Sequence, residues 1–151
     1  MEQFYIGIDI GTTATKAVCF DNTGKVIREC SQSYPMYHPK ADWSIQKPDE
    51  ILEAVLGCIQ EITKGIQPQF ISFSSAMQSI MAIDEAGKPL TDTILWADNR
   101  AHSLAEALKK SEQGERFYQK TGIPIHTFSS YNIQYCLLNQ YPLVRSFYLS
   151  Y

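Results

Sequence analysis

The stretch Gly7–Val18 holds the residues best suited to chemistry, because glycine, hydroxyl and carboxylate groups follow one another closely there. Gly11 predicts a backbone with positive φ, which lets consecutive N–H groups converge on an anion. Thr12 and Thr13 add hydroxyl donors, and Asp9 can hold hydrated Mg²⁺ or orient a nucleophile beside a phosphate. The pattern favours a phosphate-binding turn, and its spacing leaves open a plain β-hairpin with an exposed aspartate. It matches neither the Walker A loop nor the dinucleotide-binding glycine pattern.

The cysteines offer no comparable chemistry. Cys19, Cys30, Cys58 and Cys136 form no C-x-x-C pair and no metal-ligand spacing. Their simplest interpretation is that of small residues in the core of a protein from a reducing compartment.

Composition excludes several classes of function. The chain has 151 residues, which is enough for one ordinary domain with its own core. A formal net charge of −3 provides no positive field for a phosphate backbone, so nucleic acid is excluded as a partner. The uncharged stretches Gly65–Ile83 and Thr121–Val144 contain prolines and amides, so neither predicts a membrane span. The N-terminus has no signal-peptide pattern, and we expect a cytoplasmic protein.

The elements that must position the Gly7–Val18 stretch are short strands. Apolar runs at residues 4–8, 14–20 and 25–27 are separated by tight turn signals, which predicts an antiparallel three-strand meander. A helix is predicted from Pro48 to Lys64, with acidic residues in its first turn. Its apolar residues recur at helical spacing and predict one core-facing stripe, made of Ile51, Leu52, Val55, Leu56, Ile59 and Ile62.

The rest of the chain alternates between strands and helices. Strands are predicted at residues 70–73, 80–84 and 93–96, and a helix from Asp98 or Asn99 to Lys110. A further helix at residues 117–120 would end at Gly122. This order predicts an α/β class, a mixed sheet flanked by helices. The aromatic run at residues 145–151 has no terminating signal, so we expect a fragment or truncated product.

Several sequence motifs, taken together, resemble those of one protein family. The run Gly7–Asp21, G-I-D-I-G-T-T-A-T-K-A-V-C-F-D, is similar to the first phosphate motif of actin-like, sugar-kinase and Hsp70-type ATPases. Four further motifs follow in the same order as in the FGGY carbohydrate kinases. They are Pro39–Glu50, Ser74–Ser79, Ile94–Arg100 and Thr121–His126. Among FGGY kinases the combination most resembles the gluconate kinases, from residue 5 to about residue 142.

The resemblance implies a fold and a reaction. It implies an actin-like, ribonuclease H-like ATPase domain, with residues 1–151 as the first part of the N-terminal sugar-binding domain and the nucleotide-binding domain absent. The implied reaction is the ATP- and Mg²⁺-dependent, in-line phosphorylation of a sugar or sugar acid at a primary hydroxyl. The resemblance leaves open whether the longer enzyme forms a homodimer.

The resemblance also implies roles for individual residues. Asp9 would hold Mg²⁺ through water, and Gly11, Thr12 and Thr13 would face the β- and γ-phosphates. Six residues would face the sugar: Met77, Gln78, Trp96, Asp98, Arg100 and His126. Arg100 could pair with the carboxylate of a sugar acid. No catalytic residue is assigned within this chain, because the family's general base belongs to a later segment.

Purely structural roles remain possible alternatives for these residues. Trp96 and Met77 could be core residues, Asp98 a helix cap, Arg100 a solvated first-turn residue and His126 a structural histidine. Gln78 stands where gluconate-kinase relatives tend to have histidine, and the lysine that relatives have near position 133 is missing.

Other functions also stay open. A xylulose- or glycerol-type kinase, or a non-catalytic actin-like module that binds phosphate or a partner, would fit the same motifs. A radical-dehydratase activator needs closely spaced cluster cysteines, which are absent here. We expect the 151 residues alone to be inactive, because phosphoryl transfer needs both walls of the cleft.

Overall fold

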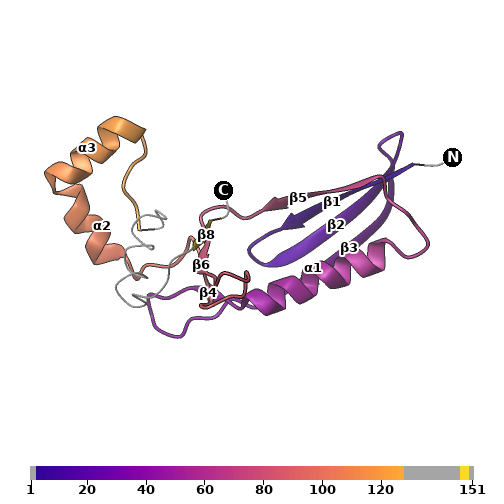
Figure 1. Cartoon of the computed structure of the whole chain (residues 1–151), viewed down its shortest axis with the longest axis horizontal. Helices are drawn as coiled ribbons and strands as arrows, with labels where there is room; N and C mark the ends of the chain where they lie inside the picture. The colour runs from indigo at the N-terminus through magenta and orange to yellow at the C-terminus, as the bar shows by residue number, and fades with distance from the viewer. Residues whose placement is uncertain (1–2, 128–146, 150–151) are drawn as a thin grey trace. The chain divides into compact units, whose positions relative to one another are not determined.

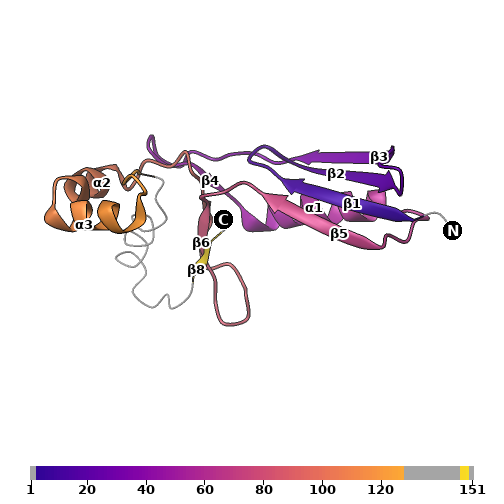
Figure 2. The ribbon, with the colours of Figure 1, turned by 90° about the horizontal axis from the view of Figure 1, so that it is seen from above.

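The computed structural model describes residues 3–127 and 147–149, which divide into two compact units (Figures 1 and 2). The two units comprise Met1–Met36 with Lys47–Ala76, and Tyr37–Gln46 with Met77–Tyr151. Within the described ranges, no helix combines the length and apolar character that a membrane span requires. Each unit has its own sheet and its own buried cluster, and each is described by itself.

A four-stranded mixed sheet forms the first unit, in the order β3-β2-β1-β5 (Figure 1). Strands β1 (Phe4–Ile10), β2 (Ala14–Asp21) and β3 (Val26–Ser33) pair antiparallel, while β5 (Phe70–Ser75) runs parallel to β1. The predicted three-strand meander and the mixed α/β class are therefore confirmed.

Helix α1 (Pro48–Ile62) covers one face of this sheet (Figure 2). Proline at its first position and acidic residues in its first turn suit a helix N-terminus, as predicted. The buried cluster between helix and sheet consists of Ile6, Ile8, Ala17, Cys19, Cys58 and Ile62. Small side chains at Ala17, Cys19 and Cys58 let the helix approach the strands closely.

The buried stripe of α1 differs from the predicted one. Leu52 and Leu56 are 55% and 48% exposed, so their assignment to the core face was wrong. The buried residues are Ala54, Val55, Cys58 and Ile62. The helix packs mainly on β2 and β3, and Leu52 and Leu56 lie outside that contact face.

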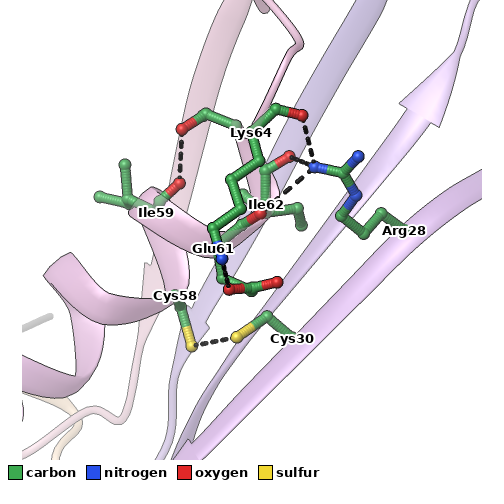
Figure 3. Close-up of polar contacts among 8 residues, drawn as sticks. Arg28, Cys30, Cys58, Ile59, Glu61, Ile62 and Lys64 are labelled. Atoms are coloured by element: carbon green, nitrogen blue, oxygen red, sulfur yellow. Dashed lines mark hydrogen bonds and ion pairs between the residues drawn. The ribbon is translucent and has the colours of Figure 1, made fainter.

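Arg28 of β3 binds the carboxyl end of α1 (Figure 3). Its Nη1 donates to the backbone carbonyls of Glu61, Ile62 and Lys64 at 3.2, 3.0 and 2.9 Å. The last carbonyls of a helix have no intrahelical partner and carry partial negative charge. A guanidinium therefore both satisfies these acceptors and complements the helix dipole.

The second unit contains a sheet of short strands in the order β4-β7-β6-β8. These are β4 (Ile45–Gln46), β7 (Thr93–Ile94), β6 (Ile80–Ala82) and β8 (Phe147–Leu149), all paired antiparallel. Ile45, Ile80, Ile94 and Ala101 form its buried cluster. Strands β4 and β8 were not predicted, because runs of two or three residues carry little periodicity.

Two helices follow in the second unit. Helix α2 (His102–Lys109) begins three or four residues later than predicted, because Asp98 is engaged in other hydrogen bonds. Helix α3 (Glu112–Thr121) begins five residues earlier than predicted, at an N-cap where the Ser111 hydroxyl accepts a bond from Gly114 N at 3.1 Å. It ends at Gly122 with φ +67°, as expected.

The contacts of Arg28 give a stability prediction. Arg28→Met keeps the aliphatic stem but removes the three hydrogen bonds, so we expect the free energy of unfolding to fall by about 1.5–3 kcal/mol. Urea titration followed by far-UV circular dichroism measures the change. The matched control is Lys25→Met, which removes an exposed positive charge from the same hairpin. Equal unfolding midpoints for the two variants would contradict a capping role for Arg28.

Candidate functional site

The turn that joins β1 to β2 is closed by its own backbone. Gly11 N donates to Ala14 O at 3.0 Å, and Ile10 pairs with Thr15. Gly11 does not have positive φ, so the predicted reason for glycine here was wrong. A Cβ on Gly11 would lie 3.2 Å from Ala14 O, so a side chain at this position would require that carbonyl to move by a few tenths of an ångström.

Asp9 lies at the carboxyl end of β1, beside this turn. Ser74 occupies the paired position on the parallel strand β5, and its hydroxyl donates to Asp9 Oδ1 at 2.6 Å. Asp9 is solvent-exposed, so the carboxylate is held by one neutral donor and remains accessible. Oxygen ligands suit Mg²⁺, which keeps several waters when it is bound by one or two carboxylates. Among the described residues no group of three metal-ligating side chains occurs.

Tyr34 fastens the turn from the end of β3. Its hydroxyl donates to Gly11 O at 2.6 Å, and its backbone N–H donates to Thr13 O at 3.2 Å. Burial raises the pKa of the Tyr34 hydroxyl, so it stays a neutral donor at physiological pH. No local pattern indicates this role, because an aromatic residue after a strand is also typical of the core. Thr12 is half-buried and Thr13 exposed in the turn that Tyr34 holds.

In the second unit, the structure brings Asp98 and Arg100 into contact. Asp98 is 1% exposed and accepts four hydrogen bonds. Its Oδ1 accepts from Arg100 Nε (2.7 Å) and N (3.0 Å), and its Oδ2 from Arg100 Nη2 (2.8 Å) and Ser44 N (2.7 Å). Because both carboxylate oxygens accept from the guanidinium, Asp98 fixes the orientation of the Arg100 side chain. Asp98 is not the N-cap of α2, which is Ala101.

Trp43 covers the guanidinium of Arg100. The Arg100 Cζ atom lies 3.7 Å from the Trp43 ring centroid, and Lys40 Nζ lies 4.4 Å from the same ring. The Arg100 side chain is only 7% exposed, so the interpretation of a solvated residue was wrong. Asp98 occupies the Nε and Nη2 edge of the guanidinium and Trp43 one of its faces, so Nη1 makes no hydrogen bond among the described residues. Trp43 belongs to the Pro39–Glu50 motif, and nothing local in the sequence indicates its contact with Arg100.

The other predicted sugar-facing residues are mostly exposed. Trp96 is 51% exposed and Met77 64% exposed, so neither is a core residue in the part of the chain that the structure describes. His126 is exposed, and its Nδ1 lies 3.1 Å from Thr127 Oγ1. Gln78 adopts φ +65°, a backbone conformation uncommon for a residue with a side chain. Such conformations cluster at functional sites.

The predicted site residues therefore form two sets. Asp9, Gly11, Thr12 and Thr13 belong to the first unit, and all six sugar-facing residues belong to the second. Ser74, Tyr34 and Trp43 support these sets and were not predicted as site residues. Of the cysteines, Cys19 and Cys58 are buried as predicted, Cys30 is half-buried, and Cys136 lies outside the described residues. Position 133, near which the resemblance led us to expect a lysine, also lies outside them.

Comparison with known proteins gives a consistent result. Residues 4–146 match the family described as FGGY family of carbohydrate kinases, N-terminal domain. The chain is 43% identical to gluconokinase from Bacillus licheniformis over 145 residues, covering 94% of this chain and 28% of that protein. It is 47% identical to gluconokinase from Bacillus subtilis over 129 residues, covering 83% and 25%.

A solved structure agrees with these relatives. The crystal structure of gluconate kinase from Lactobacillus acidophilus superposes with a TM-score of 0.90 at 31% identity, over 98% of this chain and 31% of that one. The chain thus spans between a quarter and a third of the length of these proteins.

The hydroxyl of Tyr34 gives the second prediction. Tyr34→Phe leaves the Gly11 carbonyl without its donor, so we expect about 1 kcal/mol lower unfolding free energy and faster amide exchange in residues 10–15. Hydrogen–deuterium exchange with mass spectrometry measures the local effect. Tyr5→Phe is the control, because its hydroxyl bonds only to exposed Gln3. Unchanged exchange in the turn would show that Tyr34 does not hold it.

The buried ion pair gives the third prediction. Asp98→Asn removes the charge that compensates buried Arg100, so we expect the second unit to lose about 3–5 kcal/mol of stability. Both tryptophans lie in this unit, so intrinsic fluorescence during urea unfolding reports on it. Asp92→Asn, at an exposed position, should change the midpoint little. Indistinguishable midpoints for the two variants would refute this role of Asp98.

Proposed function

Because the chain belongs to the FGGY family of carbohydrate kinases, we propose that it supplies part of an enzyme that phosphorylates gluconate or a similar sugar acid with ATP. Its mixed α/β fold is that of the N-terminal domain of this family, an actin-like ATPase fold. Residues 1–151 would be the first part of the sugar-binding domain. The observation that carries the proposal is the accessible Asp9 carboxylate, held by Ser74 beside the glycine turn in a chain 43–47% identical to gluconokinases.

On the phosphate side, Asp9 would supply a negative charge, and the turn that follows it would position the phosphates. Asp9 would hold hydrated Mg²⁺, which when bound neutralises the charge that develops on the transferred phosphoryl group. Thr12 and Thr13 would offer donors to the β- and γ-phosphates, while Gly11, whose N–H is already bonded to Ala14 O, would shape the turn. Phosphoryl transfer depends mostly on positioning and electrostatic stabilisation, so a turn fixed by Tyr34 and by the Gly11–Ala14 bond suits it.

On the sugar side, the second unit offers a cation and an apolar wall. The Nη1 edge of Arg100 would pair with the carboxylate of a sugar acid, while Asp98 keeps the guanidinium in place. Exposed Trp96 and Met77 would cover the carbon skeleton, and Gln78 and His126 would bind hydroxyls. This combination favours a sugar acid over a neutral polyol such as glycerol.

Turnover is proposed to require more than these residues. The chain spans 28% of the Bacillus licheniformis gluconokinase, and we propose that the general base and the adenosine-binding domain come from the remainder of such an enzyme. That remainder would take the proton from the primary hydroxyl and close the other side of the cleft.

A chimera tests the proposed function. Residues 4–146 of this chain replace the matched segment of the Bacillus licheniformis gluconokinase, and ADP release is followed with gluconate, xylulose and glycerol. We expect turnover with gluconate preferred, no turnover by the 151-residue chain alone, and a loss of at least about 100-fold in kcat for Asp9→Asn.

The controls separate folding from function. Asp49→Asn removes an exposed carboxylate from the first turn of α1 and should leave turnover of the chimera unchanged. A folded chimera that is inactive on all three sugars would refute the proposal and favour a non-catalytic module. Preference for xylulose or glycerol would overturn the substrate assignment alone.

A further inference from the structure

Two cysteines distant in the sequence lie in contact in the first unit. Cys30 of β3 and Cys58 of α1, separated by 28 positions, have their Sγ atoms 3.2 Å apart (Figure 3). Both thiols are free. At this separation no other atom lies between the sulfurs, and a disulfide requires them to approach from 3.2 Å to about 2.05 Å.

The two thiols differ in environment. Cys58 is fully buried, and its Sγ also approaches Thr15 O at 3.8 Å. Cys30 is half-buried at the edge of the cluster, so a small oxidant in solvent reaches it first. Burial, reinforced by the neighbouring Cys30, raises the pKa of the Cys58 thiol to about 12. Cys58 is therefore a poor first target for oxidation, because the thiolate is the reactive form.

We propose that Cys30 and Cys58 are a redox-active pair that forms a reversible intrachain disulfide when a peroxide oxidises Cys30. The Cys30 thiolate attacks one peroxide oxygen and becomes a sulfenic acid, while the O–O bond breaks and hydroxide leaves. The Cys58 sulfur then attacks the Cys30 sulfur, its proton leaves with the sulfenic hydroxyl as water, and the disulfide forms. The leaving hydroxide takes the proton that the Cys30 thiol gave up, so with hydrogen peroxide as the oxidant two thiols are oxidised to one disulfide and one peroxide is reduced to two waters.

The bond would clamp α1 to the sheet. The two residues sit where the helix packs against β2 and β3, near the Arg28 contacts at the end of α1 (Figure 3). A crosslink between positions 28 apart restricts the unfolded chain without requiring a different fold. We therefore expect oxidation to raise Tm by about 5–10 °C, and a dithiol reductant to reverse the rise.

Mass spectrometry of the peroxide-treated, folded chain tests the proposal. Alkylation of the remaining thiols followed by peptide mapping should find one crosslinked peptide containing Cys30 and Cys58, in a monomer that has lost two hydrogens. Cys58→Ala should leave Cys30 as a sulfenic acid that a dimedone probe captures. Cys30→Ala should abolish both the crosslink and the capture by the probe.

Two matched variants serve as controls. Cys19→Ala removes another buried thiol of the same cluster, and Cys136→Ser removes the remaining cysteine, and both should retain the crosslink. Peroxide treatment that leaves Cys30 and Cys58 both alkylatable in the wild-type chain would overturn the proposal. A crosslink through Cys19 or Cys136, or between two chains, would overturn it as well.

Discussion

The parallel pairing of β1 with β5 is the interaction on which the candidate phosphate site depends. It places Ser74 opposite Asp9, although the two residues are 65 positions apart. Parallel strands end at the same edge of a sheet, so the polar residues that follow both strands meet there. Without this pairing Asp9 would be one more exposed carboxylate on a hairpin. With it, the carboxylate has a hydrogen-bonded partner beside the turn that joins β1 to β2.

Burial gives two similar carboxylates different roles. Asp9 accepts one hydrogen bond from a neutral hydroxyl and is solvent-exposed, so its charge remains available to a ligand. Asp98 is 1% exposed and accepts four hydrogen bonds, so its charge is compensated within the protein. The first arrangement suits an ion from solution, and the second suits a permanent support for Arg100.

Backbone carbonyls at the ends of elements are held by side chains from other elements. Arg28 donates to the last carbonyls of α1, and Tyr34 donates to Gly11 in the β1–β2 turn. Each contact satisfies an acceptor that secondary structure leaves open, and each joins β3 to a neighbouring segment. The third strand thus stabilises both the helix and the turn, which keeps the candidate phosphate site fixed before any ligand arrives.

Local signals in the sequence determined much of this protein. The turn residues predicted the meander, Pro48 and its acidic neighbours predicted the start of α1, and the motifs indicated the family. These features can be predicted from the sequence because each depends on residues only a few positions apart. Tertiary structure alone decided that Asp98 supports Arg100, that Tyr34 fastens the Gly11 turn, and that Cys30 touches Cys58. These outcomes depend on burial and on contacts between distant segments, for which a single sequence carries no periodic signal.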